Sequence, residues 1–518
     1  MNNYENTYPG SKKISSIVRE YYPNYDIIIQ KQREQTEMSQ PLPIVLRCTE
    51  EILPKIRYVF DTLFMAYGVP VIYSAQPPST GPWLLYGSAK EASWPLDRCL
   101  AIAHCPKSWQ LFDSQADIEA TTHINDLVTV FPEKAPGFDR QSDIPFDIIA
   151  NAFYFLSSWS ERVGSNKEQT RITYSNSIFA RLNVPQDIVD QYLDVLTTQL
   201  HALCDRLAIE KWNSLEWPQG ASYALILSHD VDFIPANFID IAKQGAKTIL
   251  RHLVRQRDPL DALRAAKGLV LALLQKRDPY GCVPEIIKRE KELGMQSSFQ
   301  VAVGHRHRND VNYQIENDHV RDYLRAIPDA GFDLCLHGSY RSTENPAWYV
   351  EEAVLLTQRL GKPLGSRQHF LSFNYDALFT AQEQAGIQYD MSMGFPDRTG
   401  PRAGFSYPYF PYCLKEDRPY DVLQLNLFLM DVTLRSYMNL KGIKAWEVIK
   451  STLDELSHKR GCVSTVWHPI VFGGARDPGY DRLFWKMINY TRETGGLATD
   501  GRSINAFWRQ HAKNYSSF

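Results

Sequence analysis

Residues 224–233 read Ala-Leu-Ile-Leu-Ser-His-Asp-Val-Asp-Phe, and the rest of the chain is organised around them. Leu225, Ile226 and Leu227 form a short apolar run, which is typical of a strand buried on both faces. The run leads into a histidine and two aspartates, and parallel α/β proteins bind ligands at the carboxyl ends of their strands. Burying these polar groups unpaired is costly, so we expect a metal ion or a reaction to compensate there.

The spacing of Asp230 and Asp232 favours a site at this strand end. Side chains alternate along an extended chain, so both carboxylates leave the strand toward the same side. Metal-assisted hydrolysis needs such a pair, one carboxylate to hold the cation and one to act as base. The alternative is an Asx-type cap on the following helix, which a single aspartate would provide.

The composition is that of a globular protein and indicates more than one domain. The chain has 518 residues, of which 44% are hydrophobic and 22% charged, with a formal net charge of −3. It is too long for one ordinary core, and no overall basicity indicates a nucleic-acid partner. We find no secretory signal and no apolar run near the ~20 residues of a membrane span. The eight cysteines are scattered without a C-x-x-C pair, which favours reduced thiols in a cytoplasmic protein over a disulfide framework.

Two α/β domains are predicted, with the boundary at the Trp-Pro-Gln-Gly of residues 217–220. Residues 1–218 form an N-terminal α/β accessory domain with strands at 43–46, 70–73, 83–86 and 100–103 and helices at 52–67, 146–159 and 186–207. In residues 219–518, strands are expected at 298–303, 332–337, 366–370, 389–393, 423–430 and 463–468. Helices at 319–330, 349–360, 377–385 and 445–459 alternate with them. Repeated strand–helix units imply a parallel sheet closed or nearly closed into a barrel.

A helical basic insertion at about residues 236–285 interrupts this alternation. Its first helix has an apolar face, formed by Ile239, Ala242, Ala246, Ile249 and Leu253. Basic residues recur beside that face and just after it, at Lys243, Lys247, Arg251, Arg255 and Arg257. Like charges at this spacing destabilise a helix by roughly a few tenths of a kcal/mol each. A peripheral membrane surface or an anionic substrate would offset them, whereas a solvated face on a helix packed over the barrel is the alternative.

Polar and charged residues, most of them histidines, carboxylates and arginines, follow several of the predicted strands. They are His229, Asp230, Asp232, His337, Ser339, Tyr340, Arg341, Arg367, His369, Asp397, Arg402, Asp431 and His468. A single histidine of this kind is more often a satisfied core residue. Their collection at strand ends favours a site, and two histidines with one aspartate suit zinc or a similar divalent ion with an open position for water.

Over about residues 221–505, these motifs resemble the NodB-homology polysaccharide deacetylases, carbohydrate esterase family 4. The resemblance implies a distorted (β/α)7 barrel and a divalent metal, with zinc expected. Position by position, it assigns the base to Asp230 and a metal ligand to Asp232 from the first motif. His337 matches the first histidine of the second motif, Arg367 the arginine that holds the base, and His468 the general acid.

The N-terminal half is similar to the accessory domain that precedes some bacterial members of the same group. The similarity lies in Pro-Phe-Asp-Ile at residues 145–148 and Ala-Phe-Tyr-Phe-Leu-Ser at residues 152–157.

The sequence departs from the family pattern at the third metal ligand. Arg341 stands four residues after His337, where the family has its second histidine. His369 or His229 could complete the ligand set, and we favour His369 because the third motif reads Arg-Gln-His here. The usual adjacent aspartates are spread to Asp-Val-Asp, so which of the two is the base stays open.

The resemblance implies a deacetylase that hydrolyses the N-acetyl group of a sugar in a polysaccharide or its precursor. Further substrate contacts are expected from His229, Ser339, Tyr340, Arg341, Asp397, Arg402 and Asp431. Two other functions stay open. One is a metal-independent amidohydrolase of the same fold, and the other is a non-catalytic carbohydrate-binding or scaffold protein, which Arg341 makes tenable.

Overall fold

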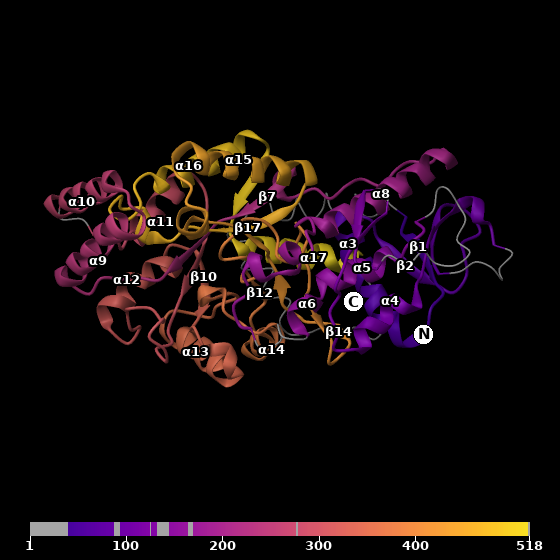
Figure 1. The fold of residues 1–518 in the computed structure, drawn as a ribbon, viewed down its shortest axis with the longest axis horizontal. Helices are drawn as coiled ribbons and strands as arrows, with labels where there is room; N and C mark the ends of the chain where they lie inside the picture. Colours follow the sequence, from indigo (N-terminus) through magenta and orange to yellow (C-terminus); the bar gives the residue numbers. More distant parts are fainter. Residues whose placement is uncertain are drawn as a thin grey trace.

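The computed structural model describes residues 40–87, 94–124, 126–131, 144–163, 169–275 and 278–515. Residues 1–39 of the predicted N-terminal domain lie outside the described residues. The described chain is elongated, with the N-terminal half at one end, the parallel sheets of the C-terminal half in the middle, and helices α9 and α10 at the far end (Figure 1).

The N-terminal half contains a four-stranded parallel sheet in the order β2-β1-β3-β4. Its strands are β1 Leu42–Leu46, β2 Val71–Ser74, β3 Trp83–Tyr86 and β4 Cys99–Ile102. Its longer helices are α3 Leu53–Tyr67, α5 Ile148–Leu156 and α8 Ile188–Leu207, with the shorter α4 Pro106–Gln110, α6 Trp159–Arg162 and α7 Ile178–Arg181. A two-stranded antiparallel pair, β5 Thr122–Ile124 and β6 Leu127–Thr129, completes it. The predicted strands and helices of this half are present, with ends that differ by at most three residues.

Helix α3 shows how local sequence sets these ends. Pro54 lies in its first turn, where its missing N–H costs no hydrogen bond. Gly68 ends it with φ 96°, a left-handed conformation that glycine adopts freely. A Cβ at Gly68 would lie 2.9 Å from the backbone nitrogen of Leu215, so both space and conformation require glycine there.

The C-terminal half contains two parallel sheets. The larger has the order β15-β12-β11-β10-β9-β8, and the smaller has the order β16-β17-β7-β18. The larger consists of β8 Ser228–Val231, β9 Ser298–Val301, β10 Asp333–Gly338, β11 Gly365–Gln368, β12 Tyr389–Asp390 and β15 Leu423–Gln424. The smaller consists of β7 Tyr223–Ile226, β16 Leu427–Met430, β17 Cys462–Val466 and β18 Gly496–Thr499. A short antiparallel pair, β13 Tyr412–Cys413 and β14 Arg418–Pro419, lies between β12 and β15 in the sequence. The predicted α/β class with a parallel sheet is confirmed.

Two chain segments join these sheets. Strands β7 and β8 are consecutive and separated only by Leu227, and β15 and β16 are separated only by residues 425–426. Backbone hydrogen bonds cross at both places, from Trp467 N to Ser228 O (3.0 Å) and from Ser464 N to Asn426 O (2.7 Å). The strands nevertheless form two sheets, so the closed seven-stranded barrel stays a prediction.

The prediction that His229 and Asp230 follow a strand is wrong. The first strand, β7, ends at Ile226, and a second strand, β8, follows at residues 228–231, so His229 and Asp230 lie within a strand. The reason is that residues 228–231 pair in parallel register with residues 298–301 of β9.

Helices alternate with these strands and cover the sheets. The predicted helices are present as α12 Asp318–Asp329, α13 Pro346–Arg359, α14 Tyr375–Ala385 and α15 Gly442–Lys459. Helices α11 Val283–Glu292, α16 Tyr480–Glu493 and α17 Gly501–Tyr515 were not predicted, and neither were strands β13, β14 and β18. Helix α17 returns to the N-terminal half, where Nε2 of His511 lies 2.8 Å from the carbonyl oxygen of Met65 on α3.

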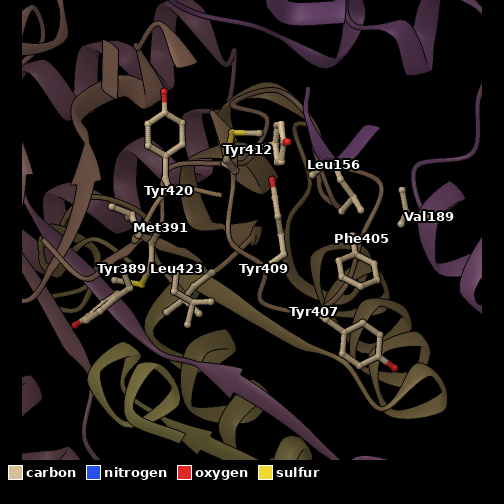
Figure 2. Close-up of a cluster of buried hydrophobic side chains, with 14 of the residues drawn as sticks. Leu156, Val189, Tyr389, Met391, Phe405, Tyr407, Tyr409, Tyr412, Tyr420 and Leu423 are labelled. Atoms are coloured by element: carbon tan, nitrogen blue, oxygen red, sulfur yellow. The ribbon is translucent and has the colours of Figure 1, made fainter. Parts of the chain in front are cut away.

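The largest apolar core crosses the predicted domain boundary. Leu156 and Val189 of the N-terminal half belong to the same buried cluster as Phe405, Tyr407 and Tyr409 of the C-terminal half (Figure 2). The two halves therefore share one packed interior, and the boundary near residue 218 stays a prediction.

The insertion folds into two helices, as predicted: α9 Phe238–Leu250, continued by a π-helical turn at Arg251–Arg255, and α10 Pro259–Leu274. The side chain of Arg255 lies outside the described part. The predicted apolar face of α9 is largely exposed, including Ile239 and Leu253, whereas Gly245 and Thr248 are buried. No helix in the described residues is both long enough and apolar enough to cross a bilayer.

Candidate metal centre

Three strands bring the predicted site residues to one edge of the larger sheet. Asp230 lies in β8, His337 in β10 and Arg367 in β11. His337 and Arg367 are paired in the parallel register of β10 and β11. Because the carboxyl ends of parallel strands share one edge, Asp232 and His369 emerge beside them, each one residue after its strand.

Asp232, His337 and His369 form a cluster that could hold a metal ion. One ligand atom from each lies within 4.8 Å of the others. Nε2 of His337 is 3.3 Å from Oδ1 of Asp232, and Nε2 of His369 is 3.6 Å from the same oxygen. Zinc bonds of about 2.0–2.1 Å in tetrahedral geometry separate ligand atoms by about 3.4 Å. The two measured separations therefore match a zinc-sized site.

The hydrogen bonding of the cluster also fits a cation. Oδ1 of Asp232 and Nε2 of His337 are buried and make no hydrogen bond to any described residue. Nδ1 of His337 donates to the carbonyl oxygen of Arg367 (2.9 Å), which leaves the lone pair of Nε2 directed at the cluster. Buried polar atoms without a partner are costly, and a metal ion would satisfy both of them.

The backbone after His369 turns sharply. Phe370 and Leu371 have φ values of 59° and 52°, in the left-handed region that residues other than glycine rarely adopt. Strained backbone of this kind is concentrated at functional sites. The turn ends β11 and leaves His369 buried beside His337, with the two ring centroids 4.7 Å apart.

Asp230 contacts the cluster but is held by an arginine. Nη1 of Arg367 donates to Oδ1 of Asp230 at 2.6 Å, and Nε of Arg367 donates to the carbonyl oxygen of Met391. The other oxygen of Asp230 lies 3.9 Å from Nε2 of His337. Arg367 is fully buried, and its two hydrogen bonds fix the orientation of the Asp230 carboxylate.

His468 reaches the cluster from the smaller sheet. Its Nε2 lies 3.5 Å from Oδ2 of Asp232, and its Nδ1 donates to Oδ1 of Asp431 at 2.7 Å. Burial disfavours the imidazolium, but the carboxylate of Asp431 outweighs burial and raises the pKa of His468 to about 9. His468 is therefore a protonated acid at neutral pH. The sequence placed Asp431 among the substrate contacts, whereas the structure places it against His468.

Charges within the cluster stabilise one another. Burial favours the neutral acid of Asp232, but His369, His337 and His468 hold its pKa well below the usual range. Burial also opposes a charge on His337, yet the carboxylates of Asp230 and Asp232 raise its pKa. An ionised Asp232 is the form that binds a cation.

His229 does not face the cluster. It is fully buried, its Nδ1 lies 2.6 Å from the carbonyl oxygen of Trp467, and its Nε2 lies 3.1 Å from Glu290. Its ring packs against Phe299. With both ring nitrogens engaged, a structural role is favoured for His229 and the metal-ligand alternative is not.

The residues after His337 are held by carboxylates. Ser339 donates from its backbone nitrogen and hydroxyl to Glu352, and the ring of Tyr340 stacks on His307 at 4.7 Å. Nε of Arg341 lies 2.7 Å from both carboxylate oxygens of Glu344 and its side chain is half exposed. Arg341 therefore takes no part in the ligand set, although it occupies the family position of a ligand.

Asp397 and Arg402 contact the N-terminal half. Asp397 accepts a hydrogen bond from the backbone nitrogen of Tyr174 (2.7 Å). Arg402 donates twice to Glu161, at 2.8 and 2.7 Å, and is buried. These contacts join the two halves of the chain, and substrate contacts at both residues stay predictions.

A basic group beside Asp431 was not predicted from the sequence. Arg251, Arg435 and Arg476 surround the buried Asp477. Burial and the nearby Arg251 lower the pKa of Arg476 to about 10, against the opposing pull of Asp431 and Asp232. The only sequence signal for the group was that Arg435 follows Asp431 by one helical turn.

Known proteins are similar to parts of the chain. The model of a family of unknown function, DUF7033, matches residues 45–205. No curated protein matches the chain significantly. Among solved structures, the chain is similar to the crystal structure of a "putative polysaccharide deacetylase" from Mycobacterium smegmatis, with 17% sequence identity and a TM-score of 0.38. That match covers 57% of this chain and 93% of the other.

Proposed function

We propose that this protein is a metal-dependent deacetylase that hydrolyses the N-acetyl group of a sugar in a polysaccharide or polysaccharide precursor. The observation that carries the proposal is the meeting of Asp232, His337 and His369, with Asp230 and His468 in contact with them. Asp230, Asp232, His337, Arg367 and His468 match the motifs of the NodB-homology deacetylases, with His369 in place of the missing second histidine. We propose that the chain is a variant member of that group.

Zinc is the ion that we propose for this centre. Asp232, His337 and His369 would hold it, because one carboxylate and two imidazoles suit zinc and leave an open position. A bound zinc ion supplies Lewis acidity toward the amide carbonyl oxygen and lowers the pKa of water.

Asp230 and His468 carry the proton transfers in this proposal. Asp230, held in place by Arg367, takes a proton from the water whose oxygen attacks the acetyl carbon. His468, kept protonated by Asp431, gives its proton to the sugar nitrogen as the carbon–nitrogen bond breaks. Acetate and an amino sugar leave. Asp230 then loses its proton to water, and His468 takes one up from water, so both residues return to their starting protonation states.

The free cysteines support a location in a reducing compartment. All eight cysteines are free thiols, and seven of them are buried. Secreted proteins of the oxidising environment commonly pair such residues. We therefore propose a cytoplasmic location for the protein.

Acetate release from N-acetylglucosamine oligomers tests the proposal. The zinc-loaded protein should release acetate, Asp230→Asn should not, and Arg341→Ala should behave like the natural chain because Arg341 pairs with Glu344 outside the cluster. Acetate release that persists without bound metal would support the amidohydrolase alternative. Oligomer binding without any release would support the carbohydrate-binding alternative.

A further inference from the structure

Exposed apolar side chains are concentrated on the hairpin formed by α9 and α10. Sixteen large hydrophobic side chains are exposed in the described part of the chain, and ten of them lie between residues 238 and 274. Leu274 and Leu263 are 76% and 68% exposed. The others are Phe238, Ile239, Leu250, Leu253, Val254, Leu260, Val270 and Leu271. Such a concentration of exposed apolar side chains on one hairpin favours a docking surface, whereas singly scattered ones would need no explanation.

The same hairpin is basic. Residues 238–275 contain seven lysines and arginines and three aspartates. Five of the basic side chains are exposed: Lys243, Lys247, Arg257, Arg264 and Lys267. Two of the three aspartates, Asp258 and Asp261, are paired with Lys441. Arg264 also pairs with Asp261 at 2.9 Å. The outer surface of the hairpin therefore combines leucines with the positive charge of the other exposed basic side chains.

The inner side of the hairpin is fixed to the body of the protein. Arg251 donates to Asp477 at 2.8 Å, and Lys441 lies 2.5 Å from Asp258. A Cβ at Gly268 would lie 2.7 Å from the carbonyl oxygen of Gly474, so the backbone of α10 packs directly against that loop. Because the inner side is anchored in this way, the outer side is held in a defined orientation at the end of the molecule (Figure 1).

We propose that the outer face of α9 and α10 docks on the surface of an anionic lipid bilayer. Leucines and valines flanked by lysines and arginines are the composition of helices that lie in the membrane interface. Anionic lipid headgroups complement the exposed basic residues, and each such residue near the surface adds about 1 kcal/mol to binding.

Charge and composition argue against a second copy of the chain, or another protein, as the partner of this surface. Two copies of the hairpin placed face to face would bring their lysines and arginines together, and like charges across an interface are costly. The centres of protein interfaces are rich in aromatic residues and poor in lysine. Phe238 is the single aromatic side chain among the ten exposed apolar residues of the hairpin.

The docking surface lies close to the metal centre along the chain. Helix α9 begins at Phe238, six residues after Asp232, a span of at most roughly 20 Å. A docked hairpin would therefore hold the centre beside the bilayer. This inference stands on the hairpin alone and does not rest on the deacetylase proposal.

Sedimentation of the full chain with vesicles tests the docking. We expect the chain to sediment with vesicles of phosphatidylcholine and phosphatidylglycerol, weakly with phosphatidylcholine alone, and less at high salt. The pair Lys243→Gln and Lys247→Gln should reduce partitioning by at least about tenfold. The pair Leu263→Ser and Leu274→Ser should reduce it similarly, because it removes buried apolar area in the docked state.

Controls separate docking from misfolding and from catalysis. Ile72→Ser and Val354→Ser change exposed apolar residues outside the hairpin and should leave vesicle binding unchanged. Thermal unfolding of every variant should match the natural chain, because the substituted side chains are exposed. The proposal would be overturned if the hairpin variants sedimented with vesicles as much as the natural chain does. It would also be overturned if the natural chain did not sediment with anionic vesicles at low salt. A dimer that Leu263→Ser dissociates, without vesicle binding, would overturn it in favour of a second copy.

Discussion

The carboxylate of Asp431 accepts a hydrogen bond from Nδ1 of His468 over 2.7 Å, and Nε2 of the same imidazole lies 3.5 Å from Asp232. Asp431 is fully buried, and burial would raise its pKa, but the facing His468 lowers it. The pair is thus held as carboxylate and imidazolium. In the proposed reaction Asp431 is a positioning residue, because it acts on the substrate only through His468.

Asp431→Asn should slow amide hydrolysis by roughly a hundredfold or more, because the imidazolium loses its partner and the leaving nitrogen loses its proton donor. An acetyl ester with a good leaving group, such as p-nitrophenyl acetate, needs little protonation and should be affected much less. Comparing kcat for the two substrates measures this difference. An equal loss on both would mean that Asp431 has only a structural role.

Asp230→Asn should lower kcat by roughly 10²–10⁴-fold, while the protein keeps its metal. Asp232→Asn should lose the metal as well as activity, because Oδ1 of Asp232 is the atom shared by both histidine contacts. Activity and metal content measured on the same preparations check both statements. If Asp230→Asn lost the metal and Asp232→Asn kept it, Asp230 would be the metal ligand and Asp232 the base.

Much of the site was predictable because strand ends in a parallel sheet converge. Predicting the strands that contain His337 and Arg367 was enough to predict that these two side chains lie at the same sheet edge as Asp230. His369 was predicted from the Arg-Gln-His motif, and its ligand atom lies with those of Asp232 and His337.

The remainder depends on contacts that leave no local pattern. Arg402 and Glu161 are 241 residues apart, and Asp431 and His468 meet only because β16 pairs with β17. Strand β8 was not predicted because His229 and Asp230 are polar, although their backbone pairs with β9. The exposed face of α9 has the same periodicity as a buried one, so its sequence could not show which way it points.

Arg402→Ala should destabilise the fold by roughly 2–4 kcal/mol, because it leaves the partly buried carboxylate of Glu161, 13% exposed, without its partner. The double variant with Glu161→Gln should recover part of that loss. Urea unfolding measures the stability. A rise in KM with unchanged stability would instead support the predicted substrate contact at Arg402.

Acid should weaken the packing of α17 on α3 through His511. Burial lowers the pKa of His511 to about 4, with the hydrogen bond to Met65 opposing only in part. The unfolded chain binds this proton near the ordinary pKa of about 6.5, so the contribution to stability is present above that pH. It is lost as the pH falls toward 4, by about 3 kcal/mol in total.

His511→Gln keeps a donor for the Met65 carbonyl oxygen without a titrating group. Its free energy of unfolding should therefore fall less than that of the natural chain between pH of about 7 and about 4. Urea unfolding across this range makes the comparison. Parallel curves for the two proteins would contradict a buried neutral His511.

The most direct test of the account is the metal content of the purified chain after dialysis against zinc and removal of loose ions. The natural chain and Arg341→Ala should each retain about one zinc per chain. His337→Ala and His369→Ala should lose it while keeping their circular dichroism. A folded natural chain that retains no zinc, or a folded His337→Ala that retains all of it, would contradict the metal centre.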